Sequence, residues 1–169
     1  MEANLNMSAA VTRMLLNSDG STTQLLESLL DTPLSVRVQM EQCCPPDKAP
    51  PLIQKVLELK DERTVMLRRS MLVTASEEWI SQNVVWICHM RCPAFVDRLH
   101  EEEKPIGKLW SEGRFSGFRK GLGSGVRQVE GHSCAVLASF KHYLIYLEQS
   151  PVMYVRETFN PKYVALPEL

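Results

Sequence analysis

A chain of 169 residues is the size of one domain and is long enough to bury an apolar core without disulfide or metal cross-links. Apolar residues make up 44% and charged residues 23% of the chain, which excludes a disordered or fibrous protein. The net charge of -1 argues against nucleic acid or an anionic membrane as a partner. We therefore predict a single domain over residues 1–169.

The cysteines and histidines show neither a disulfide framework nor a metal motif. The five cysteines are odd in number and no signal peptide precedes them, so we expect free thiols in a reducing cytoplasm. Cys88 and Cys92 have a spacing that fits neither a redox pair nor a standard zinc motif. The histidines are scattered, and no stretch approaches the ~20 apolar residues of a membrane span. These features predict a cytoplasmic protein without a metal ion.

The first third of the chain predicts two helices followed by a strand. Apolar residues at helical spacing predict a helix over 7–16. Ser21 is typical of a helix N-cap, and the leucine-rich helix that it opens ends before Pro33. Residues 35–42 alternate between apolar and polar side chains, as a half-buried strand does. Residues 43–51 are rich in proline and predict a loop.

The rest of the chain predicts two hairpins with a helix between them. Apolar runs over 64–74 and 83–90 are separated by a polar stretch and predict the first hairpin. A proline at a favourable first helical position predicts a short helix over 93–103. The apolar runs 135–147 and 152–159 predict the second hairpin.

Glycine is concentrated between that helix and the second hairpin. Residues 104–131 hold every glycine of the chain except Gly20. Because glycine is unfavourable inside both helices and strands, we predict a surface excursion or flap here.

The order of the elements predicts an α+β fold. Strands joined by hairpins pair antiparallel, and helices that stand apart from them belong to the α+β class. An antiparallel sheet needs its apolar face covered, so we expect the N-terminal helices and the 93–103 helix to lie on that face.

Glu157 is the charged residue whose position is most informative. In the last strand it shares a face with Met153, Val155 and Phe159. A carboxylate on an apolar face is unfavourable unless a partner compensates it, so Glu157 is a candidate catalytic group. On pattern alone, a structural salt bridge or a position near solvent at the strand end is the favoured interpretation.

Two adjacent arginines in the 64–74 strand are candidates for binding a carboxylate, since guanidinium forms bidentate pairs with that group. Arg68 and Arg69 face opposite ways. The alternation of side chains along the strand predicts that Arg69 points inward, because it shares a face with Val65, Leu67 and other apolar residues. A solvated arginine on the sheet surface is the simpler interpretation of either residue alone.

The turn from Gly20 to Thr23 presents backbone N–H groups at the start of a helix. Such groups form a polar site for an anion or a hydroxyl. On pattern alone, an ordinary capped helix is the favoured interpretation.

Three parts of the sequence are informative when taken in order. The first is Asn17–Thr23 with the leucine-rich helix after it. The second is Val65–Arg68, which enters an apolar strand, together with the later turn Lys104–Gly107. The third is Pro151–Phe159. In this order and spacing they resemble the chorismate lyase family, and more closely a less characterised lyase-like group beside it.

The resemblance implies an antiparallel sheet with helical flaps over an internal, largely dry site. By resemblance, Arg68 matches the arginine that grips the ring carboxylate of the substrate. Ile106, in the Pro-Ile-Gly turn that Gly107 closes, matches the residue whose backbone amide lies beside that carboxylate. Glu157 matches the carboxylate that contacts the substrate's 4-hydroxyl. Thr22 matches a turn residue whose backbone contacts the same hydroxyl. The resemblance therefore prefers Arg68 over the arginine that follows it.

The activity implied by the resemblance is the elimination of pyruvate from chorismate to leave 4-hydroxybenzoate, with no metal or organic cofactor. The fold is also similar to the effector-binding (UTRA) domains of bacterial GntR-type regulators. One alternative is therefore a non-catalytic protein that binds an aromatic carboxylate, and another is a lyase for a related enolpyruvyl ether. Each alternative implies a small-molecule partner and neither nucleic acid nor a membrane. The oligomeric state is not predicted.

Overall fold

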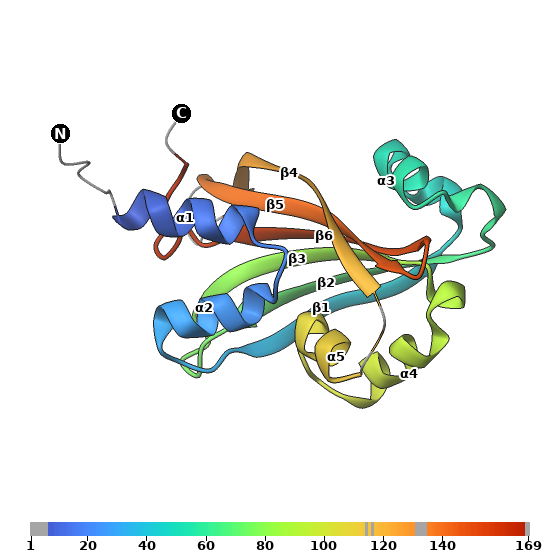
Figure 1. Ribbon diagram of the computed structural model, residues 1–169, viewed down its shortest axis with the longest axis horizontal. Coiled ribbons are helices and arrows are strands. Elements are labelled where there is room, and N and C mark those ends of the chain that lie inside the picture. The colour runs from blue at the N-terminus through green and yellow to red at the C-terminus, as the bar shows by residue number, and fades with distance from the viewer. Residues whose placement is uncertain (1–6, 114, 116, 131–134, 168–169) are drawn as a thin grey trace.

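The computed structural model describes residues 7–113, 115, 117–130 and 135–167 (Figure 1). These residues form one six-stranded antiparallel sheet with helices packed on it. The strands are β1 (Ser35–Cys44), β2 (Val65–Val73), β3 (Trp79–Ile87), β4 (Gly117–Glu130), β5 (Ala135–Leu147) and β6 (Ser150–Phe159). The helices are α1 (Met7–Asn17), α2 (Thr22–Leu30), α3 (Pro51–Val56), α4 (Pro93–Glu101) and α5 (Ile106–Glu112). The predicted α+β class is confirmed.

The strand order places the last strand in the middle of the sheet. The order is β1-β2-β3-β6-β5-β4, so two meanders of three strands meet where β3 pairs with β6. In that central pair Asn83 lies opposite Glu157 and Val85 opposite Val155. This pairing brings the first hairpin, which carries both candidate arginines, beside the strand that carries Glu157.

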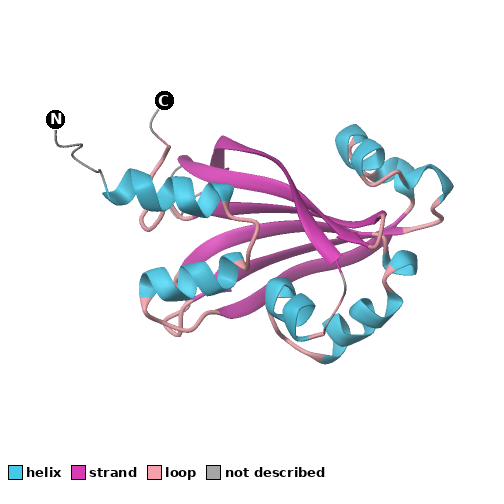
Figure 2. Ribbon diagram, viewed as in Figure 1, coloured by secondary structure: helices cyan, strands magenta, loops and turns pink. Residues whose placement is uncertain are grey.

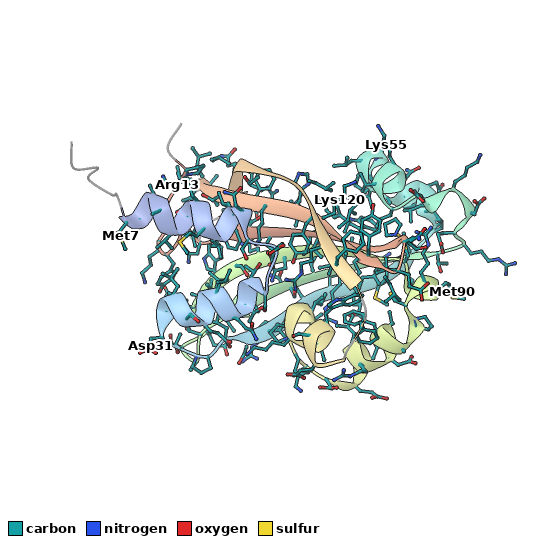
Figure 3. All side chains as sticks on the ribbon, viewed as in Figure 1. Met7, Arg13, Asp31, Lys55, Met90 and Lys120 are labelled. Carbon is teal, nitrogen blue, oxygen red and sulfur yellow. The ribbon has the colours of Figure 1, made fainter. Side chains whose placement is uncertain are left out.

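Most of the helices cover one face of the sheet (Figure 2). Leu15 of α1 and Leu26 of α2 pack with Leu72 and Phe159 of the sheet in one apolar cluster. Phe95 of α4 belongs to a second cluster on the same face, together with residues of α5 and of the central strands. Side chains fill the space between these helices and the strands (Figure 3). The prediction that the N-terminal helices and the 93–103 helix cover one face is therefore confirmed.

A third apolar cluster lies on the opposite face, at one end of the sheet. Ile53 and Leu57, in and next to α3, pack there against Val65, Trp86 and other strand residues. The two faces of β2 are therefore both apolar at this end. A strand covered on both faces loses the simple alternation that marks a half-buried strand.

The prediction of a surface excursion over 104–131 is wrong for most of its length. Residues 106–112 form α5, and the glycine-rich part forms β4, a 14-residue edge strand paired along β5. Backbone hydrogen bonds to a long partner strand outweigh the low strand propensity of glycine. Gly117 is required, because a Cβ there would lie 2.2 Å from the carbonyl oxygen of Tyr146. Gly123 has a φ of +151° at the bulge that breaks the β4–β5 register.

The described cysteines are free, and two of them lie in the core. Cys88 and Cys92 are fully buried, and burial raises the pKa of each thiol to about 12. At pH 8 only about one molecule in ten thousand then carries a thiolate at either position. We expect an alkylating reagent to modify exposed Cys43 in the native protein and to modify Cys88 and Cys92 only after unfolding. Peptide mapping after labelling checks this prediction. It also distinguishes labelling at Cys134, which lies outside the described residues, from labelling at the other cysteines.

Candidate functional site

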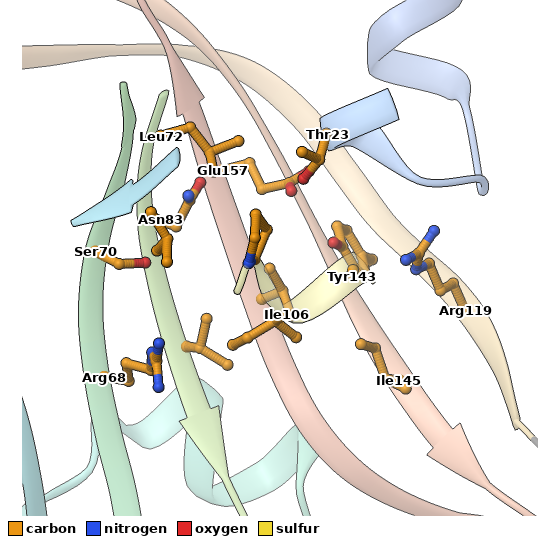
Figure 4. Close-up of a pocket in the computed structure, with 15 residues that line it drawn as sticks. Thr23, Arg68, Ser70, Leu72, Asn83, Ile106, Arg119, Tyr143, Ile145 and Glu157 are labelled. Atoms are coloured by element: carbon orange, nitrogen blue, oxygen red, sulfur yellow. The ribbon is translucent and has the colours of Figure 1, made fainter. Parts of the chain in front are cut away.

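Two neighbouring rows of side chains cross the covered face of the sheet. One row contains Arg68 on β2, Val85 on β3, Val155 on β6 and Tyr143 on β5. The next row, two residues along each strand, contains Ser70, Asn83, Glu157 and Lys141 in the same strand order. Alternate residues of a strand point to one face, so both rows face the helices. They surround a cavity under α2 and α5 (Figure 4).

The structure places Arg68 in this cavity and Arg69 on the other face. Arg68 is 2% exposed, whereas Arg69 is exposed. The alternation argument that nominated Arg69 is therefore wrong. It failed because Val65 and Leu67 share the face of Arg69 and pack beneath α3, at the end where both faces are apolar. The preference for Arg68, which came from the family resemblance, agrees with the observed burial.

The guanidinium of Arg68 is only partly satisfied by its neighbours. Its Nη1 donates to Glu41 Oε2 on the paired strand β1 at 3.0 Å, and Glu41 is also contacted by His100. The Nε of Arg68 is buried and has no hydrogen-bond partner among the described residues. Burial lowers the pKa of Arg68, and the Glu41 carboxylate opposes that effect. A buried guanidinium with an unused donor can bind an anionic ligand group.

Glu157 lies on the other side of the cavity, with donors arranged around its carboxylate. The hydroxyl of Thr22 donates to Glu157 Oε2 at 2.7 Å, and the ammonium of Lys141 lies 3.9 Å from the same oxygen. Burial, together with the Glu157 charge, raises the pKa of Tyr143 well above its ordinary value, so Tyr143 is neutral. The Cα atoms of Arg68 and Glu157 lie about 12 Å apart, because their strands are two positions apart in the sheet and the residues are offset by two along the strand direction.

Lys141 is a buried cation that the sequence interpretation missed. Its side chain is 3% exposed, and its Nζ donates to the carbonyls of Leu15 at 2.9 Å and Ser18 at 3.1 Å. Burial lowers the pKa of Lys141, and the Glu157 charge opposes that effect. Lys141 thus joins the end of α1 and the turn before α2 to the carboxylate. A detectable signal existed, since Lys141 shares a face with Tyr143 and Ile145, as Glu157 does with its apolar neighbours.

The start of α5 closes the cavity from above. Ile106 points into the cavity (Figure 4), and Gly107 lies so close to the start of α2 that an added Cβ would be 3.4 Å from Ser21 Oγ. The Ser21 hydroxyl accepts from the N–H of Gln24 at 3.4 Å, which confirms the predicted N-cap. The N–H groups of the first helical turn have no acceptor within their own helix, so those of Ile106 and Gly107 are available to a ligand.

Arg119 of β4 is a second guanidinium in the cavity wall. Its Nη1 donates to the carbonyl of Asp19 at 3.0 Å, and its Cζ lies 5.7 Å from the ring centroid of Tyr143. Its Nε is buried, without a hydrogen-bond partner within the residues that the structure describes. Sequence reasoning missed this residue because it belongs to the glycine-rich segment that was expected to form a surface excursion.

Four of the five predicted site residues line the cavity, namely Arg68, Ile106, Gly107 and Glu157. Thr22 lies next to it, and contributes its side-chain hydroxyl to Glu157. Polar residues of the lining that the sequence did not nominate are Thr23, Ser70, Asn83, Arg119 and Tyr143. They come from five different elements, and a single sequence gives no pairing that would bring them together.

The cavity is nearly closed. Its volume is about 30 Å³, which is room for one or two water molecules. An organic ligand therefore enters only when part of the lining moves outward. Among the covering elements, α5 is a single helix of seven residues, linked to β4 by a short segment. The start of this helix supplies Ile106 and Gly107 to the lining, so we expect the opening to involve that end of α5.

The His, Cys, Asp and Glu side chains of the described residues do not cluster as metal ligands would. No group of three or more His, Cys, Asp or Glu side chains among them is placed to hold a metal ion. None of the described helices is long and apolar enough to cross a membrane.

Thr22→Val tests whether the short hydrogen bond to Glu157 matters for function. The substitution keeps the shape and removes a donor to a charged group, so we expect about a tenfold loss in kcat/KM for the activity of this cavity. Thr12→Val is the matched control, because the Thr12 hydroxyl is equally buried and donates to the carbonyl of Ala165, far from Glu157. Equal losses of activity in both variants would show that only stability has changed.

The sequence matches one protein family over nearly its whole length. The family model described as chorismate pyruvate-lyase Rv2949c-like matches residues 16–166. That stretch contains every cavity residue named above. No curated protein matches the sequence.

Solved structures with a similar fold come from bacterial regulators. The effector domain of PhnF from Mycobacterium smegmatis is 10% identical, with 90% of this chain and 95% of that chain covered and a TM-score of 0.65. A ligand-binding domain from Bordetella bronchiseptica, assigned to a GntR-family transcriptional regulator, is 14% identical, with 80% and 90% covered and a TM-score of 0.56. The C-terminal domain of the histidine utilization repressor from Pseudomonas syringae pv. tomato is 9% identical, with 80% and 97% covered and a TM-score of 0.56. At these identities the likeness shows the fold alone, and the predicted fold shared with GntR-type ligand-binding domains is confirmed.

Proposed function

Since the chain belongs to the chorismate pyruvate-lyase Rv2949c-like family, we propose that it eliminates pyruvate from chorismate to leave 4-hydroxybenzoate. One observation supports this assignment most strongly. Arg68 and Glu157 are both buried in the wall of one small cavity with a mixed polar and apolar lining, at separate ends of it. A cation at one end and a carboxylate at the other suit a ring acid that carries a hydroxyl opposite its carboxylate.

Binding of the ring carboxylate is assigned to Arg68 and the start of α5. The free Nε donor of Arg68 and the N–H groups of Ile106 and Gly107 form charge-assisted hydrogen bonds with that carboxylate. Val85, Val155 and other apolar side chains contact the two faces of the ring. Arg119 is assigned to the second carboxylate of chorismate, on the enolpyruvyl group, because it is the other guanidinium of the wall with an unused donor.

Glu157 is assigned to the 4-hydroxyl of the substrate. Thr22 and Lys141 lie against one oxygen of its carboxylate, and Tyr143 also hydrogen-bonds the group. The 4-hydroxyl is assigned to the carboxylate oxygen that Thr22 does not contact. This contact fixes the C4–H bond in the orientation needed for its loss. The Lys141 ammonium compensates part of the carboxylate charge within this buried site.

The elimination breaks two bonds and forms an aromatic ring. The C4–H bond gives its electron pair to a new C3–C4 double bond, and the C3–O bond breaks with its pair on the enolpyruvate oxygen. The C4 proton passes to the methylene carbon of the enolpyruvate, either directly or by way of the Glu157 carboxylate, and this yields pyruvate with no net change in protons. Aromatisation supplies the driving force, so the protein needs mainly to position the substrate and exclude water. The scheme requires no cofactor.

The test is to mix purified protein with chorismate and to follow pyruvate and 4-hydroxybenzoate together. Equal yields of both products support the proposal. A lyase for a related enolpyruvyl ether would release pyruvate from that ether and leave chorismate unchanged.

A non-catalytic binding protein is the second candidate, and the likeness in fold to ligand-binding domains of regulators favours it. Under this alternative chorismate or 4-hydroxybenzoate raises the melting temperature, and no pyruvate forms. Failure of both turnover and stabilisation would reject both candidates for these two ligands.

A further inference from the structure

An open groove lies on the face of the sheet away from α1 and α2, next to the apolar cluster beneath α3. Its volume is about 570 Å³. Arg69 of β2 and Arg156 of β6 line it, and Val84 of β3 lies between them in register. Each of these arginines is the chain neighbour of a substrate-cavity residue, so it points to the opposite face of the same strand.

A third arginine reaches the same groove from the edge strand. Arg127 of β4 lines the groove, and its Nη1 lies 3.5 Å from Thr158 Oγ1 on β6. Three strands distant in sequence thus direct guanidinium groups into one concavity, which we call the arginine groove. Gln39, Gln82 and Gln128 add side-chain amides to its wall.

The positive charge of the arginine groove is not neutralised within the described residues. None of the three arginines forms an ion pair there, although most of the partly buried arginines and lysines elsewhere among the described residues do. Glu130 is the only carboxylate among the described residues of the wall, and it is not paired with any of them. The Nε of Arg156 is buried, and no residue in the described part of the chain hydrogen-bonds it. Burial lowers the pKa of Arg156, and the charges of Arg127 and Arg69 lower it further.

This arrangement is unfavourable without an anion and favourable with one. The three guanidinium charges repel one another, and a bound oxyanion reduces that repulsion. Its oxygens also accept hydrogen bonds from the unused N–H groups. The net charge of the whole chain is -1, so no general basic field attracts long polyanions such as nucleic acid. Convergence of the donors in a concavity suits a compact ligand.

We propose that the arginine groove binds a small, multiply charged oxyanion, of the phosphate or polycarboxylate class, independently of the substrate cavity on the other face. The site does not depend on the lyase assignment, because no residue with a role in elimination contributes a charge to it.

Calorimetric titration of the full chain with inorganic phosphate, pyrophosphate and citrate, at constant ionic strength, tests the proposal. We expect saturable binding of at least one of these anions with one site per chain. Preference for pyrophosphate or phosphate over citrate assigns a phosphoryl ligand, and the reverse assigns a polycarboxylate. In Arg69→Gln/Arg127→Gln we expect the Kd to rise by about a hundredfold, which is roughly tenfold for each lost guanidinium.

Two further variants make the result specific. Arg13→Gln/Arg63→Gln removes the same charge from exposed positions, one of them on α1 (Figure 3), and should leave the Kd unchanged. Arg68→Ala removes the cation of the substrate cavity and should also leave it unchanged. Three outcomes overturn the proposal: loss of binding in Arg68→Ala, equal weakening in both double variants, or binding of a short DNA duplex with none of the three small anions.

Discussion

Arg68→Ala is expected to lower kcat/KM for chorismate by about a thousandfold while the protein stays folded. The substitution removes the buried guanidinium that is assigned to the ring carboxylate. Loss of one partner from a buried, hydrogen-bonded charge pair costs about 2–5 kcal/mol, and 4 kcal/mol corresponds to about a thousandfold in rate. The fold tolerates the change because the remaining partner, Glu41, is 26% exposed and can be hydrated. Steady-state kinetics with circular dichroism measure both effects.

Arg69→Ala is the matched control for that experiment. It removes the same side chain one residue further along β2, on the face opposite the cavity. We expect kcat/KM within about a factor of two of the native value, since a surface substitution far from a site changes little. If Arg69→Ala were the inactive variant and Arg68→Ala the active one, the assignment of the cavity would be rejected.

Glu157→Gln is expected to lower kcat by two to three orders of magnitude and to reduce stability as well. The amide keeps the size of the side chain and loses the charge that binds the 4-hydroxyl, an effect of about 10²–10³ for a positioned charge in a dry site. It also leaves the buried ammonium of Lys141 without its carboxylate. We expect a stability loss of about 2 kcal/mol, below the usual range for a broken buried pair, because two carbonyls still accept from Lys141.

The two consequences of Glu157→Gln can be separated with a second substitution. In Glu157→Gln/Lys141→Met the unpaired charge is gone, so part of the lost stability should return while kcat stays low. Denaturant unfolding of the native protein, both single variants and the double variant gives the coupling energy between the two residues. Strictly additive stability losses would show that the 3.9 Å approach of Lys141 to Glu157 carries no energy.

Periodicity predicted the elements well where one rule governs a segment. Ser21 opens α2 as expected, and the strand over 35–42 and both hairpins occur within a few residues of their predicted limits. Glu157 was found because a lone carboxylate stood in an otherwise apolar strand face. Each of these inferences uses only local sequence.

The wrong predictions concern residues whose position is determined by tertiary contacts rather than by local sequence. Alternation pointed to Arg69 because it cannot show that α3 covers the second face of β2. Glycine content hid β4, whose strand is held by β5 rather than by its own propensity. Arg119 was therefore missed because β4 itself was not predicted. Lys141 was missed because it lies inside an apolar run. Their roles depend on carbonyls of the α1–α2 turn, which no pattern in β4 or β5 reveals.

The position of β6 between β3 and β5 has a consequence for biosynthesis. Residues 150–159 are translated after every other strand, yet they occupy the centre of the sheet. Until they emerge, the nascent chain holds two separate half-sheets, each with an open inner edge able to pair with another chain. Most contacts of β6 with β3 span about 70 residues, which favours slow folding. Protection of those two edges by a chaperone, or fast release from the ribosome, is therefore expected to govern the yield of soluble protein.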